Sequence, residues 1–328
     1  MSTRRRCLAA GAAWPALAWT GALRAQATAP VVIGWMGNGG REGSLPSLKV
    51  FSEGMTALGW KMGAQYVLEE RWADGQMDRL PALAQELATK KPAVIVSLGS
   101  TTSRALTAAA PTTPIVQADG DPVAAGLVTN LARPGGMITG ISNVTFELNQ
   151  KLIELLVESL PSLRRVGFVA DSTVRAHGAN VVNVRRAAER LRFEAVIAEM
   201  ERPQDIEPAF VGLAKARVQA IVILAAAWIT GPSLKKITQL GLAQGWPVVG
   251  IPRSVASQGG LFSYGPNGVA RVQRAAYYVD RILKGAKPGD LPIEQPTTFR
   301  LVLNLKTAKT LGITFPSSML LPATEVIE

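Results

Sequence analysis

Short apolar runs alternate along this chain with segments in which apolar residues recur at helical spacing. In the first half the runs predict β-strands at 31–36, 66–72, 93–98, 114–118 and 137–141. In the second half they predict strands at 165–170, 193–198, 220–224, 247–250 and 261–264. The run AVIVSL at 93–98 does not alternate apolar with polar residues, which is typical of a parallel sheet covered on both faces. The pattern therefore predicts an α/β fold.

The two sets of strands follow the same plan. Equivalent strands begin 134, 127, 127, 133 and 124 residues apart, which are the differences between the starting positions above. Repeated β-α-β units of one order and spacing predict two similar lobes. We assign residues 28–142 and 265–295 to lobe one, and residues 143–264 and 296–328 to lobe two. The chain would then cross a hinge at 141–144, 263–266 and 295–299.

Ligands of open parallel sheets bind beyond the carboxyl ends of the strands, so residues that follow each strand are candidates for a cleft between the lobes. Ser100, Thr101 and Thr102 open a predicted helix after the strand at 93–98. Their hydroxyl and N–H groups suit a carboxylate, although they also suit ordinary helix capping, which we expect in either case. Asp171 and Ser172 follow the first strand of lobe two, where a cap is the favoured alternative.

Three large apolar residues also fall near strand ends. Trp35 and Met36 end the first strand, and Trp228 follows the strand at 220–224. Aromatic rings on opposite cleft walls could sandwich an apolar ligand, whereas burial beneath a loop is the ordinary fate of tryptophan. Asp121 lies two residues beyond Asp119, but a carboxylate pair with no metal or histidine partner is weak evidence for catalysis, and Asp121-Pro122 is typical of a turn.

The glycines of 34–40 bear a loose likeness to a dinucleotide-binding loop. Their spacing is irregular, and the segment 41–47 is expected to delay any helix that could receive a pyrophosphate. The stretch is better explained as a flexible turn.

The first 27 residues have the features of an export signal. Arg4, Arg5 and Arg6 precede an apolar segment at 7–23, and Ala25-Gln26-Ala27 forms a small-x-small cleavage site. We expect cleavage near Ala27 after export by the Sec or the twin-arginine route, and therefore a periplasmic protein. A membrane anchor is the alternative, but the apolar segment is short and interrupted for a spanning helix.

Composition excludes several classes of function. The net charge is +11, and removal of four arginines with the first 27 residues leaves 31 basic and 24 acidic residues, or +7. The basic residues are scattered, so a nucleic-acid partner is not expected. The chain has one cysteine, Cys7 in the signal, and one histidine, His177 in an expected exposed loop. A zinc site of His and Cys ligands or a Cys-His dyad cannot be assembled, and we expect no enzyme, metal or cofactor.

Several longer strings resemble one known family. They are DPVAAGLVTNLARPGGMITGIS at 121–142, GGLFSYGP at 259–266, YVDRILKGAKPGDLPIEQPTTFRLVLNLKTAKTLGI at 278–313 and the final LLPATEVIE. They are similar to the ABC-transporter substrate-binding proteins that include tryptophan- and tyrosine-binding proteins. The resemblance implies a type I periplasmic-binding-protein fold, with two Rossmann-like lobes, a three-stranded hinge and a ligand cleft. It also implies capture of a small molecule, without catalysis, for an ABC permease in the inner membrane. We expect a monomer.

The resemblance places ligand contacts in loops at 35–38, 99–102 and 118–121 of lobe one, and at 171–172, 226–228 and 251–253 of lobe two. The candidate ligand-binding residues are Trp35, Met36, Asn38, Ser100, Thr101, Thr102, Ala118, Asp121, Asn143, Asp171, Ser172, Ala226, Trp228 and Arg253.

One departure from the family bears on the ligand. Relatives similar to aromatic amino-acid binders tend to carry an aspartate just after the first crossing, where this chain has Ser142-Asn143-Val144. An α-ammonium group then lacks its expected partner, and Arg253 would suit a carboxylic acid. We expect a small carboxylate-bearing ligand, either an amino acid or an aromatic acid. The alternative function is a periplasmic sensing module that feeds a signalling receptor.

Overall fold

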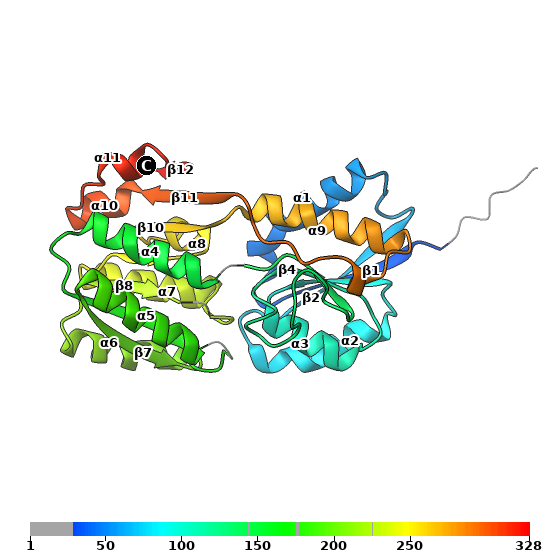
Figure 1. Ribbon diagram of the computed structural model, residues 1–328, viewed down its shortest axis with the longest axis horizontal. Helices are drawn as coiled ribbons and strands as arrows, with labels where there is room; N and C mark the ends of the chain where they lie inside the picture. Colours follow the sequence, from blue (N-terminus) through cyan, green and yellow to red (C-terminus); the bar gives the residue numbers. More distant parts are fainter. Residues whose placement is uncertain (1–28, 144, 175–176, 225) are drawn as a thin grey trace, which may run out of the picture.

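The computed structural model describes residues 29–143, 145–174, 177–224 and 226–328, which form two α/β lobes, each built on its own sheet (Figure 1). The expected signal segment at 1–27 lies outside the described residues. Within the described part of the chain, no helix is both long and apolar enough to cross a membrane.

Lobe one contains a parallel five-stranded sheet in the order β2-β1-β3-β4-β5. Its helices cover both faces: α1 packs on α9, and α9 on β3, β4 and β5, whereas α2 packs on α3 and β2 (Figure 1). The apolar positions of 33–36 and 94–96 are buried between these layers, as their lack of alternation predicts. The elements are β1 (Val31–Gly37), α1 (Arg41–Ala57), β2 (Tyr66–Trp72), α2 (Leu80–Thr89), β3 (Val94–Leu98), α3 (Ser100–Ala109), β4 (Ile115–Asp119), β5 (Ile138–Gly140) and α9 (Gly268–Leu283).

The expected delay before the first helix is wrong, because α1 begins at Arg41, directly after Gly40. Pro46 lies inside this helix and removes one backbone hydrogen bond. The helix nevertheless buries Leu48, Phe51 and Met55 against the sheet and α9. Tertiary packing of an apolar face outweighs the low helix propensity of its first turns.

Lobe two contains a seven-stranded sheet in the order β12-β11-β10-β9-β8-β6-β7. Neighbouring strands pair in parallel except β10 and β11, so β11 and β12 run antiparallel to the other five strands. The elements are α4 (Thr145–Ser159), β6 (Arg165–Asp171), α5 (His177–Leu191), β7 (Glu194–Met200), α6 (Ile206–Lys215), β8 (Ala220–Ile223), α7 (Gly231–Ala243), β9 (Val248–Gly250), α8 (Arg253–Ser257), β10 (Phe262–Pro266), β11 (Phe299–Asn304), α10 (Leu305–Leu311), α11 (Ser317–Leu320) and β12 (Glu325–Ile327).

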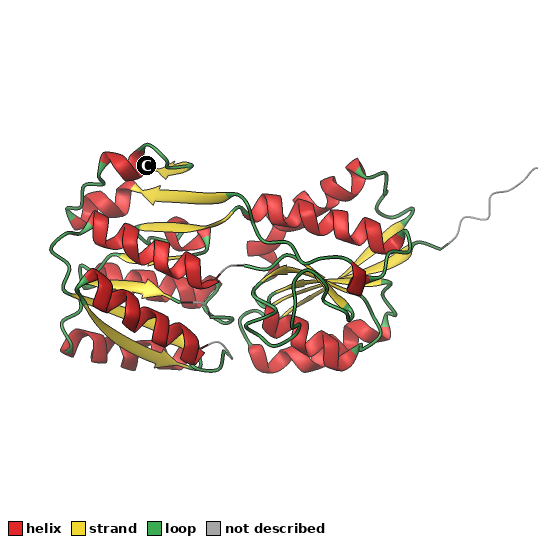
Figure 2. Ribbon diagram, in the orientation of Figure 1, coloured by secondary structure: helices red, strands yellow, loops and turns green. Residues whose placement is uncertain are grey.

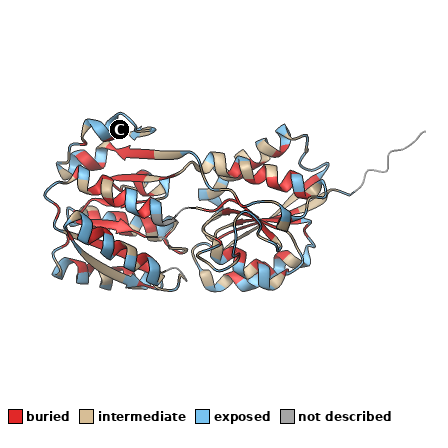
Figure 3. Ribbon diagram, in the orientation of Figure 1, coloured by how far each residue is buried: buried red, intermediate tan, exposed pale blue. Residues whose placement is uncertain are grey.

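The predicted duplication is visible in the sheets. The order β2-β1-β3-β4-β5 of lobe one recurs as β7-β6-β8-β9-β10 in lobe two, and β11 and β12 extend the second sheet beyond it. Figure 2 shows the strands gathered in two separate sheets, one in each lobe. Buried residues concentrate along each sheet and on the helix faces that cover it (Figure 3). Each lobe therefore has its own hydrophobic core, and the two-lobed fold predicted from the sequence is confirmed.

Backbone pairing gives the connections between the lobes a defined geometry. Ile141 forms an isolated bridge with Glu294, and β10 pairs with β11 over Phe262–Pro266. Arg274 on α9 holds the Glu294 carboxylate with bonds of 2.6 and 2.5 Å. The hydrogen bond and charge of Arg274 lower the pKa of Glu294 despite its partial burial. The bridge and the Arg274 pair fix the segment at Glu294 to lobe one, whereas β10 and β11 pair within the sheet of lobe two.

Candidate ligand-binding site

A cavity of about 750 Å³ lies between the lobes at the ends of their central strands. Its lobe-one side is formed by residues that follow β1, β3 and β4, together with the start of α9. Its lobe-two side is formed by residues that follow β6, β8 and β9. The volume is within the range of about 300–1,000 Å³ found for small-molecule pockets. The cavity is therefore where the sheet topology predicts a ligand.

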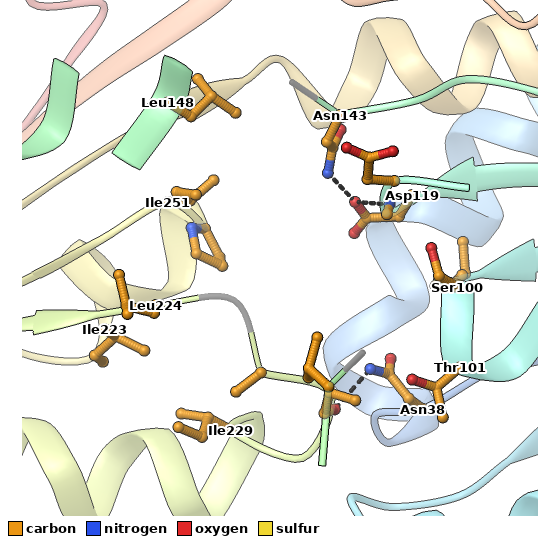
Figure 4. A pocket seen from close by; sticks show the side chains of 18 of the residues that line it. Asn38, Ser100, Thr101, Asp119, Asn143, Leu148, Ile223, Leu224, Ile229 and Ile251 are labelled. Atoms are coloured by element: carbon orange, nitrogen blue, oxygen red, sulfur yellow. Dashed lines mark hydrogen bonds between the residues drawn. The ribbon is translucent and has the colours of Figure 1, made fainter. Parts of the chain in front are cut away.

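A charged cluster forms the upper part of the lobe-one wall (Figure 4). Asp119 ends β4 and its Oδ1 accepts hydrogen bonds from Asn143 Nδ2, from Arg271 and from the backbone N–H of Gly120, the last at 2.8 Å. Arg271 Nη1 also donates to Asn143 Oδ1 at 3.2 Å. No hydrogen bond from the described residues reaches the other oxygen of Asp119, Oδ2. The cluster can therefore offer a carboxylate oxygen to a ligand.

The Asp119 carboxylate is held in its charged form. Burial between the lobes raises its pKa, but the charge and hydrogen bond of Arg271, with the bonds from Gly120 and Asn143, outweigh that effect and lower the pKa below its ordinary value. Its side chain keeps 43% of its surface accessible, so the group is enclosed by the cavity without being sealed from solvent.

The N-terminus of α3 lies beside this cluster and lacks the side-chain cap that we expected. Gly99 is the N-cap residue, with φ +133° and no capping side chain. No described group accepts the backbone N–H of Ser100, Thr101 or Thr102. A Cβ built on Gly120 would lie 2.5 Å from Ser100 Oγ, so only glycine lets the two loops approach this closely. The unsatisfied N–H groups suit an anion.

Most side chains of the lobe-two wall are aliphatic, and its polar members are Thr173, Asn180, Arg253 and Ser254 (Figure 4). Ile223 and Leu224 at the end of β8, Ile251 after β9 and Ile229 face the polar groups of lobe one across the cavity. Leu148 of α4 and Leu234 of α7 extend the same surface. Among the described lining residues there is no aromatic side chain, so the predicted aromatic sandwich is not found in this cavity.

The lobes also touch below the cavity, at a contact that we call the lip. Asn38 Nδ2 donates to the backbone oxygen of Ala227 at 2.6 Å, across the gap between lobes (Figure 4). Met77 of lobe one packs against the core cluster that contains Trp228. On the lobe-two side of this contact, Asp171 fixes the backbone of Ala227, because its Oδ2 accepts a hydrogen bond from the N–H of Ala227 at 3.3 Å. The lip forms only when the lobes are close together.

The structure brings half of the sequence-predicted residues to the cavity and places the others elsewhere. The lining contains Asn38, Ser100, Thr101, Asp121, Asn143, Ala226 and Arg253. Outside the lining lie Trp35, Met36, Thr102, Ala118, Asp171, Ser172 and Trp228.

The residues outside the lining have identifiable structural roles. Trp35 is fully buried and packs edge-on against Phe51 at 5.2 Å, and Met36 and Ala118 are buried in the same lobe. Trp228 is 2% exposed in the core of lobe two. Their side chains enter the cores because β1 is covered on both faces and the loop after β8 folds back onto its own lobe.

The remaining polar residues outside the lining also bond within the protein, with one exception. Asp171 accepts from Thr173 at 3.0 Å and Ser172 donates to Glu201 at 3.4 Å. The Thr102 hydroxyl is buried and has no partner among the described residues.

Two charged lining residues are already engaged. Arg253 forms a bidentate ion pair with Glu325, and its Nε–Oε2 distance is 2.9 Å. Asp121 Oδ1 accepts from the N–H groups of Val123 and Ala124, both at 3.0 Å, as its position before a proline predicts. Arg253 therefore has its carboxylate partner within the protein, which reduces its suitability for a ligand acid.

Sequence reasoning predicts Asn143 and the loop 118–121 as ligand contacts, but it does not predict the ion pair between Asp119 and Arg271. Asp119 and Asp121 as a carboxylate pair are weak evidence for chemistry, and Arg271 lies 152 residues from Asp119 in the chain, on α9. The local signal for Asp119 is its position at the end of a strand, within an expected contact loop. His177 is also not in a loop, since it begins α5 and lies 2.9 Å from Glu199.

This arrangement defines a class of protein that encloses a small molecule between two lobes. No group of three or more metal-ligating side chains is found among the described residues. The chain belongs to the ABC transporter substrate binding protein family, whose model matches residues 43–327. Members of this family bind solutes rather than catalyse reactions, in agreement with the sequence prediction.

Individual relatives agree with this assignment. The tyrosine-binding protein of Clostridioides difficile (strain R20291) is 21% identical over 266 residues, which are 81% of this chain and 76% of that protein. A conserved domain protein from Vibrio cholerae has the same fold, with a TM-score of 0.83 and 25% identity, over 90% of this chain and 99% of that one. A domain from Streptococcus pneumoniae in complex with L-Trp has a TM-score of 0.81 and 23% identity, over 91% and 100%.

Proposed function

We propose that this protein is the extracytoplasmic binding component of an ABC importer. It captures a small α-amino acid with an apolar body, closes over it and presents it to a permease in the inner membrane. The observation that carries the proposal is the pairing of a charged, donor-rich wall on lobe one with an aliphatic wall on lobe two. An apolar amino acid has the same two-sided character.

The α3 N-terminus is the proposed site for the ligand carboxylate. The helix provides backbone N–H groups at Ser100 and Thr101 with no acceptor among the described residues, and the positive end of its dipole favours an anion. The buried Thr102 hydroxyl without a partner is a second, independent sign that polar contacts at this end are incomplete within the protein.

The charged cluster is the proposed site for the ligand ammonium. Asp119 directs Oδ1 to Arg271, Asn143 and Gly120, which leaves Oδ2 for a ligand donor. The lowered pKa keeps the group ionised at neutral pH. Asp119 thus supplies the carboxylate that the sequence 142–144 lacks, and an amino acid becomes a better candidate than an acid without an amino group.

Closure of the lobes is the proposed mechanism of capture. A ligand held only by lobe one leaves its apolar body in water, and contact with Ile223, Leu224 and Ile251 forms only when lobe two approaches. Since the ligand gains these contacts in the closed state alone, it shifts the population toward that state. The lip bond from Asn38 to Ala227 adds to the same closed arrangement.

The relatives support an amino acid as ligand. One is a tyrosine-binding protein and another was solved in complex with L-Trp. The cavity, at about 750 Å³, has room for an aromatic amino acid even though its wall is aliphatic.

Calorimetric titration with matched compounds tests this function. We expect binding of L-tyrosine, and at least tenfold weaker binding both of tyramine, which lacks the carboxylate, and of 3-(4-hydroxyphenyl)propionate, which lacks the ammonium. If 3-(4-hydroxyphenyl)propionate binds as tightly as L-tyrosine, the ammonium site at Asp119 is wrong. If no member of a panel of the twenty L-amino acids raises the melting temperature, the amino-acid function is wrong.

A further inference from the structure

A second pocket, of about 360 Å³, lies in lobe two between α4 and α5. Asn149 projects into it from α4, and Asn180 and Asn183 line it from α5. Asn180 also belongs to the lining of the cavity between the lobes. The two spaces are therefore neighbours that share one side chain.

Two side chains of this pocket have unmet hydrogen-bonding capacity. Asn149 and Asn180 are 4% and 3% exposed, and the Oδ1 atom of each is buried with no partner among the described residues. Buried amide oxygens nearly always receive a hydrogen bond from protein, water or ligand. Leucine or valine at either position would fill the space between the helices without leaving a buried polar atom unpaired. The presence of an amide at both positions therefore indicates a role in recognition.

We propose that the α4–α5 pocket receives the far end of the ligand's side chain, and that Asn180, assisted by Asn149, selects side chains that end in a hydrogen-bond donor. This inference rests on the proposed function, because it places the α-carboxylate and ammonium of the same ligand on the lobe-one wall. The aliphatic wall then contacts the middle of the side chain, and a terminal hydroxyl or N–H reaches the amides.

The charges around the pocket agree with a neutral donor. Arg190, on its rim, is paired with Glu154 at 2.8 Å, and Glu147 and Arg186 lie on opposite helices of the same rim. Opposite charges at the rim give no net preference for an anion or a cation. Among amino acids, a phenol hydroxyl or an indole N–H meets the requirement and a plain phenyl ring does not.

Separate titrations of the protein with L-tyrosine and with L-phenylalanine isolate this contact, since the two amino acids differ by one hydroxyl. We expect the wild-type protein to prefer L-tyrosine by about tenfold or more, because a site built to bond a hydroxyl leaves its own polar groups unpaired with the analogue. In Asn180→Leu the preference should fall to about onefold, through loss of L-tyrosine affinity. Asn149→Leu should reduce the preference in the same direction.

Val182→Ser is the matched control. Val182 lies on the same helix, is 48% exposed and lines neither the pocket nor the cavity between the lobes, so the preference should remain. Melting of the ligand-free variants verifies folding, and Asn180→Leu is expected to melt no lower than wild type. If Asn180→Leu fails to fold, Asn149→Leu and Asn180→Ala carry the same test.

The outcomes separate the two proposals. An unchanged tyrosine preference in the folded Asn180 and Asn149 variants would mean that the amides bond only to water, and would overturn the inference while leaving the function intact. Equal affinity of wild-type protein for both amino acids would do the same. If neither amino acid binds the wild-type protein, the proposed function fails and the inference with it.

Discussion

The two lobes share one strand order but present opposite surfaces to the cavity. At the ends of β3 and β4, lobe one has uncapped N–H groups and Asp119, which pairs with Arg271 of α9. At the equivalent ends of β8 and β9, lobe two has Ile223, Leu224 and Ile251. A duplicated scaffold thus leaves strand ends at the same positions, while the residues at those ends are free to differ in chemistry.

This difference divides recognition between the lobes. Charged contacts fix the orientation of a ligand on lobe one, whereas the apolar wall of lobe two adds affinity roughly in proportion to the area it covers. Neither wall alone encloses the ligand, so tight binding requires closure. Variants that alter one wall at a time measure how strict this division is.

Asp119→Asn should have the largest effect. The substitution keeps the size of the side chain and removes its charge, so a bound ammonium loses its partner and Arg271 loses its ion pair. Truncation of one partner of a hydrogen-bonded charge pair costs about 2–5 kcal/mol, and we expect L-tyrosine affinity to fall by about 100-fold. Isothermal titration calorimetry measures the loss.

Asp121→Asn is the control for that variant. Asp121 lies on the same loop and lines the same cavity, but its Oδ1 caps the N–H groups of Val123 and Ala124, a role that asparagine retains. Its affinity should stay within about twofold of wild type. Comparable losses in the two variants would show that loop charge in general, rather than the Asp119 contact, determines binding.

Ile251→Ser tests the other wall. Ile251 is partly buried and faces the cavity, so the substitution removes apolar surface that the ligand would cover. Loss of one such side-chain contact is worth about 1.5 kcal/mol, or roughly tenfold in affinity. The control is Val211→Ser, because Val211 is 56% exposed on lobe two away from the cavity. An unchanged affinity for L-tyrosine in Ile251→Ser would argue that lobe two contributes no apolar contact there.

The fold was accessible from the sequence because it depends on periodic patterns that many residues repeat. Uniformly apolar runs identified the buried parallel strands, and their matched spacing identified the duplication. The start of α1 was not accessible, since Gly43 and Pro46 locally oppose a helix that packing on α9 stabilises. Local sequence patterns do not predict a helix whose stability comes from packing against an element distant in the chain.

The site was only partly accessible for a related reason. The rule that ligands bind beyond the carboxyl ends of parallel strands predicted the loops that form the cavity. Four of the predicted polar residues line it: Asn38, Ser100, Thr101 and Asn143. It could not decide which side of a loop each side chain takes, so Trp35 and Trp228 were assigned to the cleft although both are buried in the cores. The Asp119–Arg271 pair joins residues far apart in the chain, and no single sequence pattern marks such a pair.

The pH dependence of stability gives a smaller effect that is specific to lobe one. Because the pKa of Asp119 is lowered in the folded state, its pairing stabilises the protein above the ordinary aspartate pKa of about 3.9. That contribution is lost as the pH falls through the lowered folded value. Its size should be about 1 kcal/mol, since the group is partly accessible.

Urea unfolding of the ligand-free protein from pH 7 to pH 3 measures this contribution. Glu294 and Glu325 also have lowered pKa values, each through a hydrogen bond from an arginine. Several carboxylates therefore contribute to the loss of wild-type stability at acid pH. The difference between wild type and Asp119→Asn isolates one of them. That difference should shrink toward acid pH, and a constant difference from pH 7 to pH 3 would rule out the ionised carboxylate as its source.

Asn38→Ala should have the smallest effect, because the one side-chain hydrogen bond that it removes among the described residues is the lip bond to Ala227. The lost bond to Ala227 exists in the closed state alone, so the variant should dissociate every ligand faster by about threefold, with little change in association rate. Gln76→Ala is the control, since Gln76 is exposed nearby and has no side-chain hydrogen bond among the described residues. Stopped-flow measurements with L-tyrosine and L-phenylalanine decide the matter. A change in their affinity ratio would mean that Asn38 contacts the ligand itself, and that lobe one recognises more than the charged end.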